Sequence, residues 1–188
     1  MPAGRPARRR RLRAFLVSNE GATAVEFAMV AFPFFVLLFG VLELGMLFMA
    51  SATIDAATTQ VARQIRTGQF QSSASHSTSD FKTAVCNGMS WISSSDCQAN
   101  LSVDARTFAS FSAIDLTTPI KNNQIDQTQL TFTPGNACDI VLVRVFYPWT
   151  LITPVLEPGL PNLGPNQRLL TTAVAFRNEN WTNGPPCS

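Results

Sequence analysis

The sequence predicts an α+β protein in which a long N-terminal transmembrane helix runs into a small head with a mainly antiparallel sheet. Three observations predict this fold class. A long apolar run ends at residue 49, helical periodicity continues to about residue 67 and returns between residues 79 and 92, and alternating or β-branched segments occupy the second half of the chain. Helices followed by strands are typical of α+β domains.

The composition places the positive charge in a short leader. Of the 188 residues, 46% are hydrophobic and 14% charged, which excludes a disordered polymer and a general nucleic-acid coat. Six of the fourteen basic residues precede residue 14, and no acid precedes Glu20. The chain after residue 21 has eight basic and eleven acidic side chains, a net charge of −3. We therefore expect no nucleic-acid partner.

The apolar run covers residues 27–49, with Glu43 as its one charge. As a helix of about 35 Å it is long enough to cross a bilayer. A basic cluster on its N-terminal side places the N-terminus in the cytoplasm and the C-terminal head outside. The arginines that set this topology are Arg8, Arg9, Arg10, Arg11 and Arg13.

Two other interpretations of this run remain open from the sequence. One is a buried helix of a soluble domain. The other is a cleaved signal peptide, for which residues 50–52 (Ala-Ser-Ala) supply a small-residue cleavage pattern. The apolar region exceeds the roughly 7 to 15 residues usual in signal peptides, and carboxylates lie in or beside it.

Glu26, just before the apolar run, requires a partner. A carboxylate on a lipid-facing helix costs on the order of 3 kcal/mol unless it is paired. Gly21 lies five residues earlier, at the start of the apolar region. A cut after Gly21 would place the new α-amine of Ala22 one helical turn before Glu26, at the i, i+4 spacing. The cut would supply the missing cation, within one subunit or between neighbours.

Residues 8–66 resemble a class of type IV prepilins, with a basic leader, Gly before the cut, Glu at mature position five and an apolar helix. The segment GATAVEFAMVAFPFFVLLFGVLELGMLFMA more closely resembles the TadE-like minor pilins (pseudopilins) of the tight-adherence (Tad/Flp) pilus system. Phe27 stands where the major pilins of this system usually carry Tyr, which fits a minor component. The later segments CDIVLVRVFYPW and LLTTAVAFRNE also resemble the C-terminal half of TadE-like proteins.

The resemblance implies a function in assembly or initiation of an adhesive pilus, as in biofilm formation. It implies cleavage after Gly21 by a prepilin peptidase, Ala22 as the new N-terminus, and Glu26 as the residue that guides subunit docking. The implied partners are the peptidase, other pilin and minor pilin subunits, the inner-membrane assembly platform and the lipid bilayer. Glu43 matches the family's Gly-x-x-Glu-Leu-Gly segment, and its side chain either reaches water at the interface or meets another subunit.

The helix is expected to continue beyond the membrane, over residues 20–67 and about 70 Å. Ile54, Val61 and Ile65 recur on one face, and Gly68 offers a stop. This gives three expected parts: a leader (1–21), a transmembrane and assembly helix (22–67), and an α+β head (68–188).

In the head we expect coil over residues 69–78, then a short helix to about residue 92 whose N-cap is Ser77, Thr78 or Ser79. Strands are expected at residues 101–105, 130–132, 140–147 and 172–176, with the third in the centre of the sheet. Five prolines over residues 148–165 predict a loop.

Four cysteines lie on the outer side, where disulfides form. Three pairings are possible. We favour Cys86 with Cys97, because a helix followed by a short Ser-rich loop brings them together, which leaves Cys138 for Cys187. No CxxC pair occurs, and the one histidine, His76, lies in a Ser-rich segment, so neither a metal nor a cofactor is expected.

No catalytic motif points to an enzyme, since the sequence has no phosphate-binding loop, HExxH or GxSxG. The alternatives to a minor pilin are a membrane-anchored periplasmic binding protein, a secreted domain released near Ala52, and a pseudopilin of a secretion system. The minor pilin, the anchored binding protein and the secreted domain differ in their mature N-terminus, whereas the lack of a long filament would favour the secretion-system pseudopilin.

Overall fold

A computed structural model describes residues 20–73, 76–153, 162–181 and 187. The leader arginines and residues 154–161 of the proline-rich segment lie outside the described residues. The chain divides into two compact units, residues 1–41 and residues 42–188. The described part of the first unit is the N-terminal half of one helix, and the second unit contains the rest of that helix and the head.

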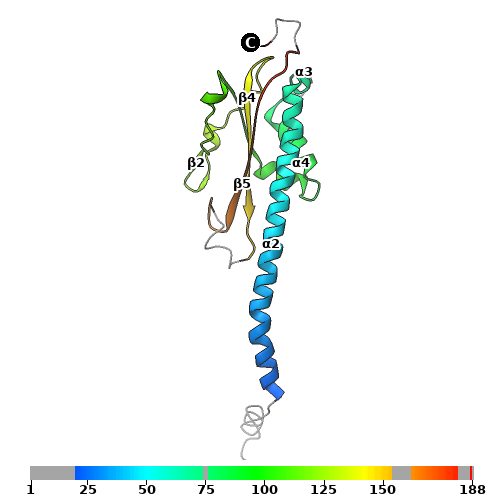
Figure 1. The fold of residues 1–188 in the computed structure, drawn as a ribbon, viewed down its shortest axis with the longest axis vertical. Helices are drawn as coiled ribbons and strands as arrows, with labels where there is room; N and C mark the ends of the chain where they lie inside the picture. The colour runs from blue at the N-terminus through cyan, green and yellow to red at the C-terminus, as the bar shows by residue number, and fades with distance from the viewer. Residues whose placement is uncertain (1–19, 74–75, 154–161, 182–186, 188) are drawn as a thin grey trace, which may run out of the picture. The chain divides into compact units, whose positions relative to one another are not determined.

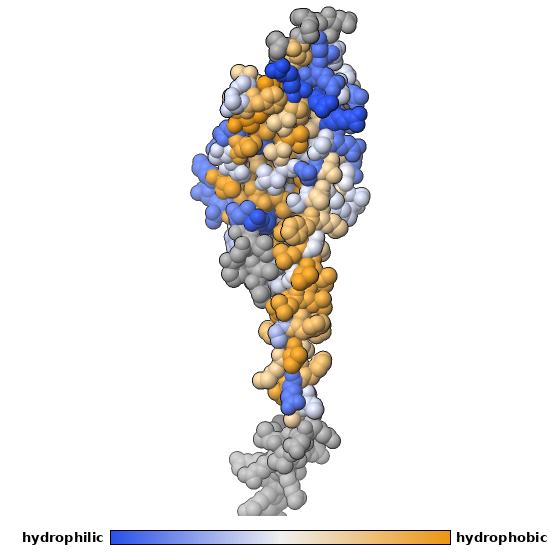
Figure 2. Space-filling view, in the orientation of Figure 1, coloured by the Kyte–Doolittle hydropathy of each residue, from blue (hydrophilic) through white to orange (hydrophobic). Residues whose placement is uncertain are grey.

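The long helix α2 (Glu20–Arg66) runs without interruption through Pro33 and confirms the expected helix to within one residue. In the first unit its apolar side chains are exposed, as Phe27 (73%) and Phe32 (74%) illustrate, and Figure 2 shows apolar residues along the visible side of this half. Among the described residues, it is the helix long and apolar enough to cross a membrane. Only 6% of the most apolar 18-residue stretch of this helix is buried, which argues against the core helix of a soluble domain.

The second unit is built on a three-stranded antiparallel sheet with the order β1-β4-β5 (Figure 1). Its strands are β1 (Ser102–Phe108), β4 (Ile140–Thr150) and β5 (Gln167–Arg177). Val143 of β4 lies opposite Ala105 of β1 and Val174 of β5. The sheet confirms the α+β class and the central position of the third expected strand. Residues 140–146 of β4 are all buried, which explains their nearly continuous apolar sequence.

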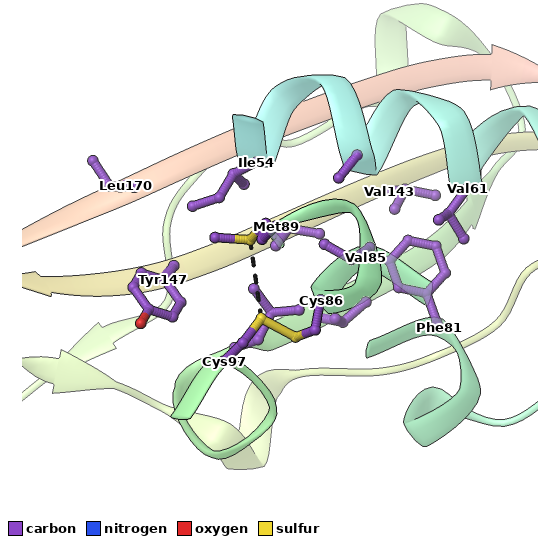
Figure 3. Close-up of a cluster of buried hydrophobic side chains, with 14 of the residues drawn as sticks. Ile54, Val61, Phe81, Val85, Cys86, Met89, Cys97, Val143, Tyr147 and Leu170 are labelled. Atoms are coloured by element: carbon purple, nitrogen blue, oxygen red, sulfur yellow. Dashed lines mark hydrogen bonds between the residues drawn. A yellow bond between two sulfur atoms is a disulfide. The ribbon is translucent and has the colours of Figure 1, made fainter. Parts of the chain in front are cut away.

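The main core lies between one face of this sheet and the helices (Figure 3). The helices are α2, α3 (Gln69–Ser72), α4 (Thr78–Gly88) and α5 (Ser94–Asn100). Helix α2 contributes buried residues spaced three or four apart, and β4 contributes every second residue. These residues are Leu47, Ala50, Ile54, Ala57, Val61 and Ile65 from α2, with Val141, Val143, Val145 and Tyr147 from β4.

A smaller core of Phe146, Leu163 and Leu169 lies on the opposite face, because β4 alternates its side chains between faces. Near it the chain forms the hairpin β2 (Ile120–Lys121) and β3 (Gln124–Ile125) and the turns η1 (Phe111–Ala113) and η2 (Gln127–Gln129). The hairpin turn has positive φ at Asn122 and Asn123, the backbone that a type I′ turn requires.

Three expectations about the head need correction. The coil at residues 69–78 contains α3, and a further helix, α5, was not expected. The short helix α4 ends at Gly88 rather than near residue 92. Its N-cap is Ser77, one of the three expected candidates, and a capping box with Asp80 supplies hydrogen bonds to the first turn. The expected strand at residues 130–132 is a single parallel bridge between Phe132 and Ala105.

Strand β4 also continues to Thr150, through a proline at which we expected a loop to begin. Pro148 lies opposite Leu169 of β5, whose N–H donates outside the sheet, to the Asn162 side chain at 2.7 Å. Pro148 and Leu169 therefore lie opposite each other without a backbone hydrogen bond between them. On the other side of β4, the pairing with β1 extends only to Phe146, which lies opposite Ser102, the first residue of β1. The missing N–H of Pro148 therefore removes no hydrogen bond from either strand pair.

Candidate assembly interface

The proposed cleavage site lies at the accessible start of α2. Gly21 and Ala22 belong to its first turn and are exposed. No atom lies within 4 Å of the position that a Cβ on Gly21 would take, so nothing in the described fold requires glycine there. The first amides of a helix have no intrahelical acceptor and its end opens at low cost. The Gly21–Ala22 bond therefore lies in an exposed helical turn, and cleavage there stays a prediction.

Glu26 and Phe27 lie one turn later and are also exposed. Helix geometry puts the Cβ atoms of Ala22 and Glu26 about 5 to 6 Å apart. Within the described part of the chain, no cation forms an ion pair with Glu26. Its carboxylate is available to a cation that the described fold does not supply.

The structure corrects one of the two expectations for Glu43, that its side chain reaches water, whereas a contact with another subunit stays a prediction. Its side chain is only 2% exposed, so it does not extend into water. Its two carboxylate oxygens accept hydrogen bonds from the backbone N–H groups of Ile152 and Thr153, just after the end of β4. The partner of Glu43 is therefore a segment of its own chain. No local pattern in the sequence connects these residues.

The other end of α2 is held by the chain that follows β5. Arg66 and Glu179 form a salt bridge at 2.9 Å, and the N–H of Glu179 donates to the carbonyl of Arg66 at 2.8 Å. Gly68 ends the helix at a φ of 75°, and a Cβ there would lie 2.5 Å from the ring of Trp181. Glycine is required at this position by both the backbone conformation and the packed indole.

Two open grooves, of about 280 and 360 Å³, run between α2 and β5. They are lined mainly by apolar and hydroxyl side chains, including Phe48, Ser51 and Thr171. Asp55 beside them accepts a hydrogen bond from the hydroxyl of Thr172. Such grooves suit contact with another protein surface more than the binding of a small substrate, which favours enclosed pockets with convergent polar groups.

The comparison with known families decides what this helix is. The family model described as TadE-like protein matches residues 21–63. The helix is TadE-like. Neither the curated proteins nor the solved structures contain a match to the chain. The match over residues 21–63 suggests involvement in the Tad pilus system, and the TadE-like family is generally structural rather than enzymatic.

The TadE-like segment begins at Gly21 and ends three residues before the end of α2. It includes Ala22, Glu26 and Phe27 in the first unit and Glu43 in the second. Its apolar helix is compatible with a single-pass membrane anchor. The head beyond residue 66 lies outside the match, so its description depends on the structure alone.

Two disulfides stabilise this head outside the TadE-like segment. Cys86 of α4 bonds Cys97 of α5 within the main core, and Cys138 bonds Cys187 near the C-terminus. This is the pairing favoured from the sequence. Among the described residues, no group of three or more His, Cys, Asp and Glu side chains is arranged to hold a metal ion.

A buried ion pair lies on the face of the sheet opposite α2. The Asp104 carboxylate accepts hydrogen bonds from Arg144 at 2.7 Å, from Arg106 at 2.9 Å and from the N–H of Thr131 at 2.9 Å. Arg144 also donates to the carbonyl of Thr117 at 2.7 Å. Burial raises the pKa of Asp104, but the bonds from Thr131 and the two arginines outweigh it, so the net pKa is below its usual value.

Proposed function

We propose that this protein is a minor pilin, or pseudopilin, that is needed for assembly or initiation of a Tad/Flp-type adhesive pilus and is cleaved after Gly21 by a prepilin peptidase. The observation that carries the proposal is the state of Glu26. It is an exposed carboxylate beside an exposed apolar helix, and the described part of the chain offers it no cation.

The proposed mechanism is assembly rather than turnover. An unpaired carboxylate in lipid costs on the order of 3 kcal/mol. Cleavage after Gly21 creates the Ala22 amine near the same depth in the membrane. Pairing of Glu26 with this amine, in its own subunit or in a neighbour, removes the cost and sets the axial register between helices. The exposed apolar side chains of the first unit then pack against each other instead of lipid.

Two acids of the TadE-like helix, Glu26 and Glu43, support this proposal by their contrast. Glu43 is buried, and each of its carboxylate oxygens accepts a backbone hydrogen bond from its own chain. Glu26 is exposed, and no cation among the described residues pairs with it. We therefore assign subunit docking to Glu26 and Phe27, with Gly21 and Ala22 as the cleavage site, and give Glu43 a role within the subunit.

The proposed partners follow from this mechanism. They are the prepilin peptidase, other pilin and minor pilin subunits, the inner-membrane assembly platform and the bilayer. The basic leader, with Arg8 to Arg11 and Arg13, keeps the N-terminus in the cytoplasm and the head in the periplasm. The two disulfides fit a head that folds in an oxidising compartment.

The first experiment is the N-terminal sequence and intact mass of the protein from membranes of cells that carry the whole pilus operon, with and without the prepilin peptidase. We expect a start at Ala22 that depends on the peptidase. A start at Met1 in both strains would contradict the proposal and indicate an anchored receptor. A start near Thr53 would indicate a secreted domain.

The second experiment tests the role of Glu26. A Glu26→Ala chain is expected to enter the membrane and keep a folded head, yet to support no pili in electron micrographs. Glu26→Gln keeps the shape without the charge and should fail in the same way. Glu26→Asp is the matched control, because it keeps the charge and should retain part of the assembly. Normal pili with Glu26→Ala would count decisively against this mechanism.

A further inference from the structure

The sheet of the head has one covered edge and one open edge. On the β1 side, the N–H of Ala105 donates to the carbonyl of Thr131, and the N–H of Thr133 donates to the carbonyl of Ala105, both at 2.8 Å. The chain therefore covers the middle of this edge with its own backbone. On the other side, β5 pairs only with β4.

The outward backbone groups of β5 are identified by its end contacts. The N–H of Leu169 and the carbonyl of Gln167 bond to the Asn162 side chain and backbone, away from β4. In an antiparallel strand, alternate residues direct both backbone groups to the same side. Thr171, Ala173 and Ala175 therefore face outward. They are exposed, and within the described chain no hydrogen bond reaches their backbone from that side.

This open stretch, residues 171–175, is called the β5 edge below. Among the described residues, it lacks the protection that edge strands normally have. Residues 169–176 read LLTTAVAF, without a charge or a proline, whereas exposed edges are usually blunted by lysine, proline or a bulge. The outward-facing residues carry small side chains that leave the backbone approachable. An uncharged edge of this kind fits an uncharged, extended strand.

The surroundings of the β5 edge provide room for side chains of such a strand. The groove of about 280 Å³ between α2 and β5 includes Thr171 of the edge and, from α2, Phe48 and Ala52. Phe48 is 72% exposed. A neighbouring strand would bury this apolar surface while it completes the backbone hydrogen bonds.

The direction of β5 excludes an antiparallel pair of two copies. Thr153, which precedes β5, contacts Glu43 of α2. Glu179, which follows β5, contacts Arg66 at the C-terminal end of α2. Strand β5 therefore runs in the same direction as α2. Copies inserted into one membrane in one orientation have parallel β5 strands. A twofold pair of parallel β5 strands would place each N–H opposite the same N–H, and no hydrogen bonds would form. The β5 edge of a second copy is therefore excluded as the occupant, and the remaining candidates are extended strands of other subunits.

We propose that the β5 edge accepts an extended, uncharged strand from a different pilus subunit anchored in the same membrane. This inference rests on the proposed function for the identity of its partner. The addition would extend the three-stranded sheet by one strand and link two heads outside the membrane. This contact is separate from the contacts between helices.

Hydrogen exchange of single amides tests the inference directly. The mature full-length chain is placed in lipid nanodiscs, alone and after purification with the other subunits of the operon. Alone, the outward amides of Thr171, Ala173 and Ala175 should exchange quickly, and the inward amides of Thr172 and Val174 slowly. In the complex, the outward amides should slow by at least about tenfold. Unchanged outward amides in the complex would overturn the inference, as would outward amides already protected in the chain alone.

Substitutions at Ala173 give an independent test. Ala173→Pro removes an outward N–H that β4 does not use, and Ala173→Lys adds a charge to the edge. Both should abolish the added protection at Thr171 and Ala175, while the matched control Ala173→Ser should keep it. Retained protection in the Pro and Lys variants would contradict the inference.

Photo-crosslinking from position 175 identifies the occupant. The crosslinked peptide is expected to be an uncharged segment of another pilus subunit. A crosslink to a second copy of this chain would overturn the choice of partner. In the same samples, an N-terminus at Ala22 reports on the proposed function. A normal Ala22 start with an unprotected edge would reject this inference alone, whereas an uncleaved chain would reject the proposed function.

Discussion

The carboxylate of Glu43 accepts a hydrogen bond of 2.8 Å from the backbone N–H of Thr153, 110 residues further along the chain. It also accepts one from the N–H of Ile152. Both amides lie beyond the end of β4, where the strand ladder no longer supplies acceptors. The acid in the apolar sequence of α2 is therefore explained by the folding of the subunit itself. This contact fixes the end of β4 against α2.

Glu43→Ala is expected to destabilise the head by about 2 kcal/mol, because two amides lose a charged acceptor. Unfolding of the head in detergent micelles, followed by the fluorescence of its three tryptophans, measures the loss. Glu43→Gln keeps one oxygen acceptor and should lose less. The matched control is Glu26→Ala, which should leave the unfolding midpoint unchanged. Equal stability of the Glu43→Ala and parent proteins would show that water replaces the carboxylate at no cost.

The main features of the fold were predictable because local patterns carry them. Gly68 after a run of helical periodicity gave the end of α2, and the β-branched run of β4 gave the central strand. Cys86 and Cys97 pair as expected because the chain between them is short. Each of these signals involves residues that are close together in the sequence. The sequence alone therefore contains the information needed to predict these features.

The remaining features depend on contacts between distant parts of the chain. Helix α5 begins in a Ser-rich stretch without apolar periodicity, and a disulfide into the main core holds it. Phe132 alternates with its neighbours as in a strand, yet only one bridge to Ala105 forms. The partner of Glu43 was unpredictable for the same reason. The role of Glu26 stays a prediction, and it depends on a local spacing from Gly21.

The Asp104–Arg144 ion pair predicts a pH dependence of stability. Because the folded pKa of Asp104 is lowered, the pair contributes stability that is fully present above the unfolded pKa of about 3.9 and is lost as pH falls through the folded pKa. Urea unfolding between pH 7 and pH 2 should therefore show stability decreasing below about pH 4. Other carboxylates titrate in the same range, so the comparison with a variant is necessary.

Asp104→Asn isolates the contribution of this ion pair. At pH 7 it leaves Arg144 buried without its counter-charge, which should cost about 3 kcal/mol. Toward low pH the difference between the parent and the variant should shrink, because protonation removes the same charge from the parent. A constant difference over the whole range would mean that Asp104 stabilises the head through shape rather than charge.

The two disulfides should contribute unequally. In the chain-entropy description, the bridge that spans 11 residues, Cys86–Cys97, contributes about 3 kcal/mol and the bridge that spans 49, Cys138–Cys187, about 4 kcal/mol. Unfolding midpoints of the two Cys→Ser pair variants measure this order. The first pair is also buried, so polar serines there add a desolvation cost that Cys→Ala avoids. Alkylation of the native, non-reduced protein from the periplasmic side should modify no thiol, and four modified thiols would contradict both bridges.

The contact between α4 and α2 provides a test of packing. Gly88 ends α4, and a Cβ on it would lie 2.7 Å from the Cβ of Ala57 in α2. Carbon atoms in contact normally lie about 3.5 to 4 Å apart, and the Ala57 methyl cannot move without its backbone. Gly88→Ala should therefore destabilise the head by about 1 to 3 kcal/mol, because the two helices must separate. Thermal unfolding of the full-length chain measures the shift.

A second substitution distinguishes this clash from an effect of Gly88 on its own backbone. Ala57→Gly removes the methyl that the new Cβ would meet, at a cost of about 1 kcal/mol for glycine within a helix. If the clash is the cause, the double variant should be more stable than the sum of the two single losses predicts, because the added methyl occupies the space that Ala57 has left. Additive losses would place the effect in the C-terminal turn of α4 and would mean that α2 and α4 are free to adjust their separation.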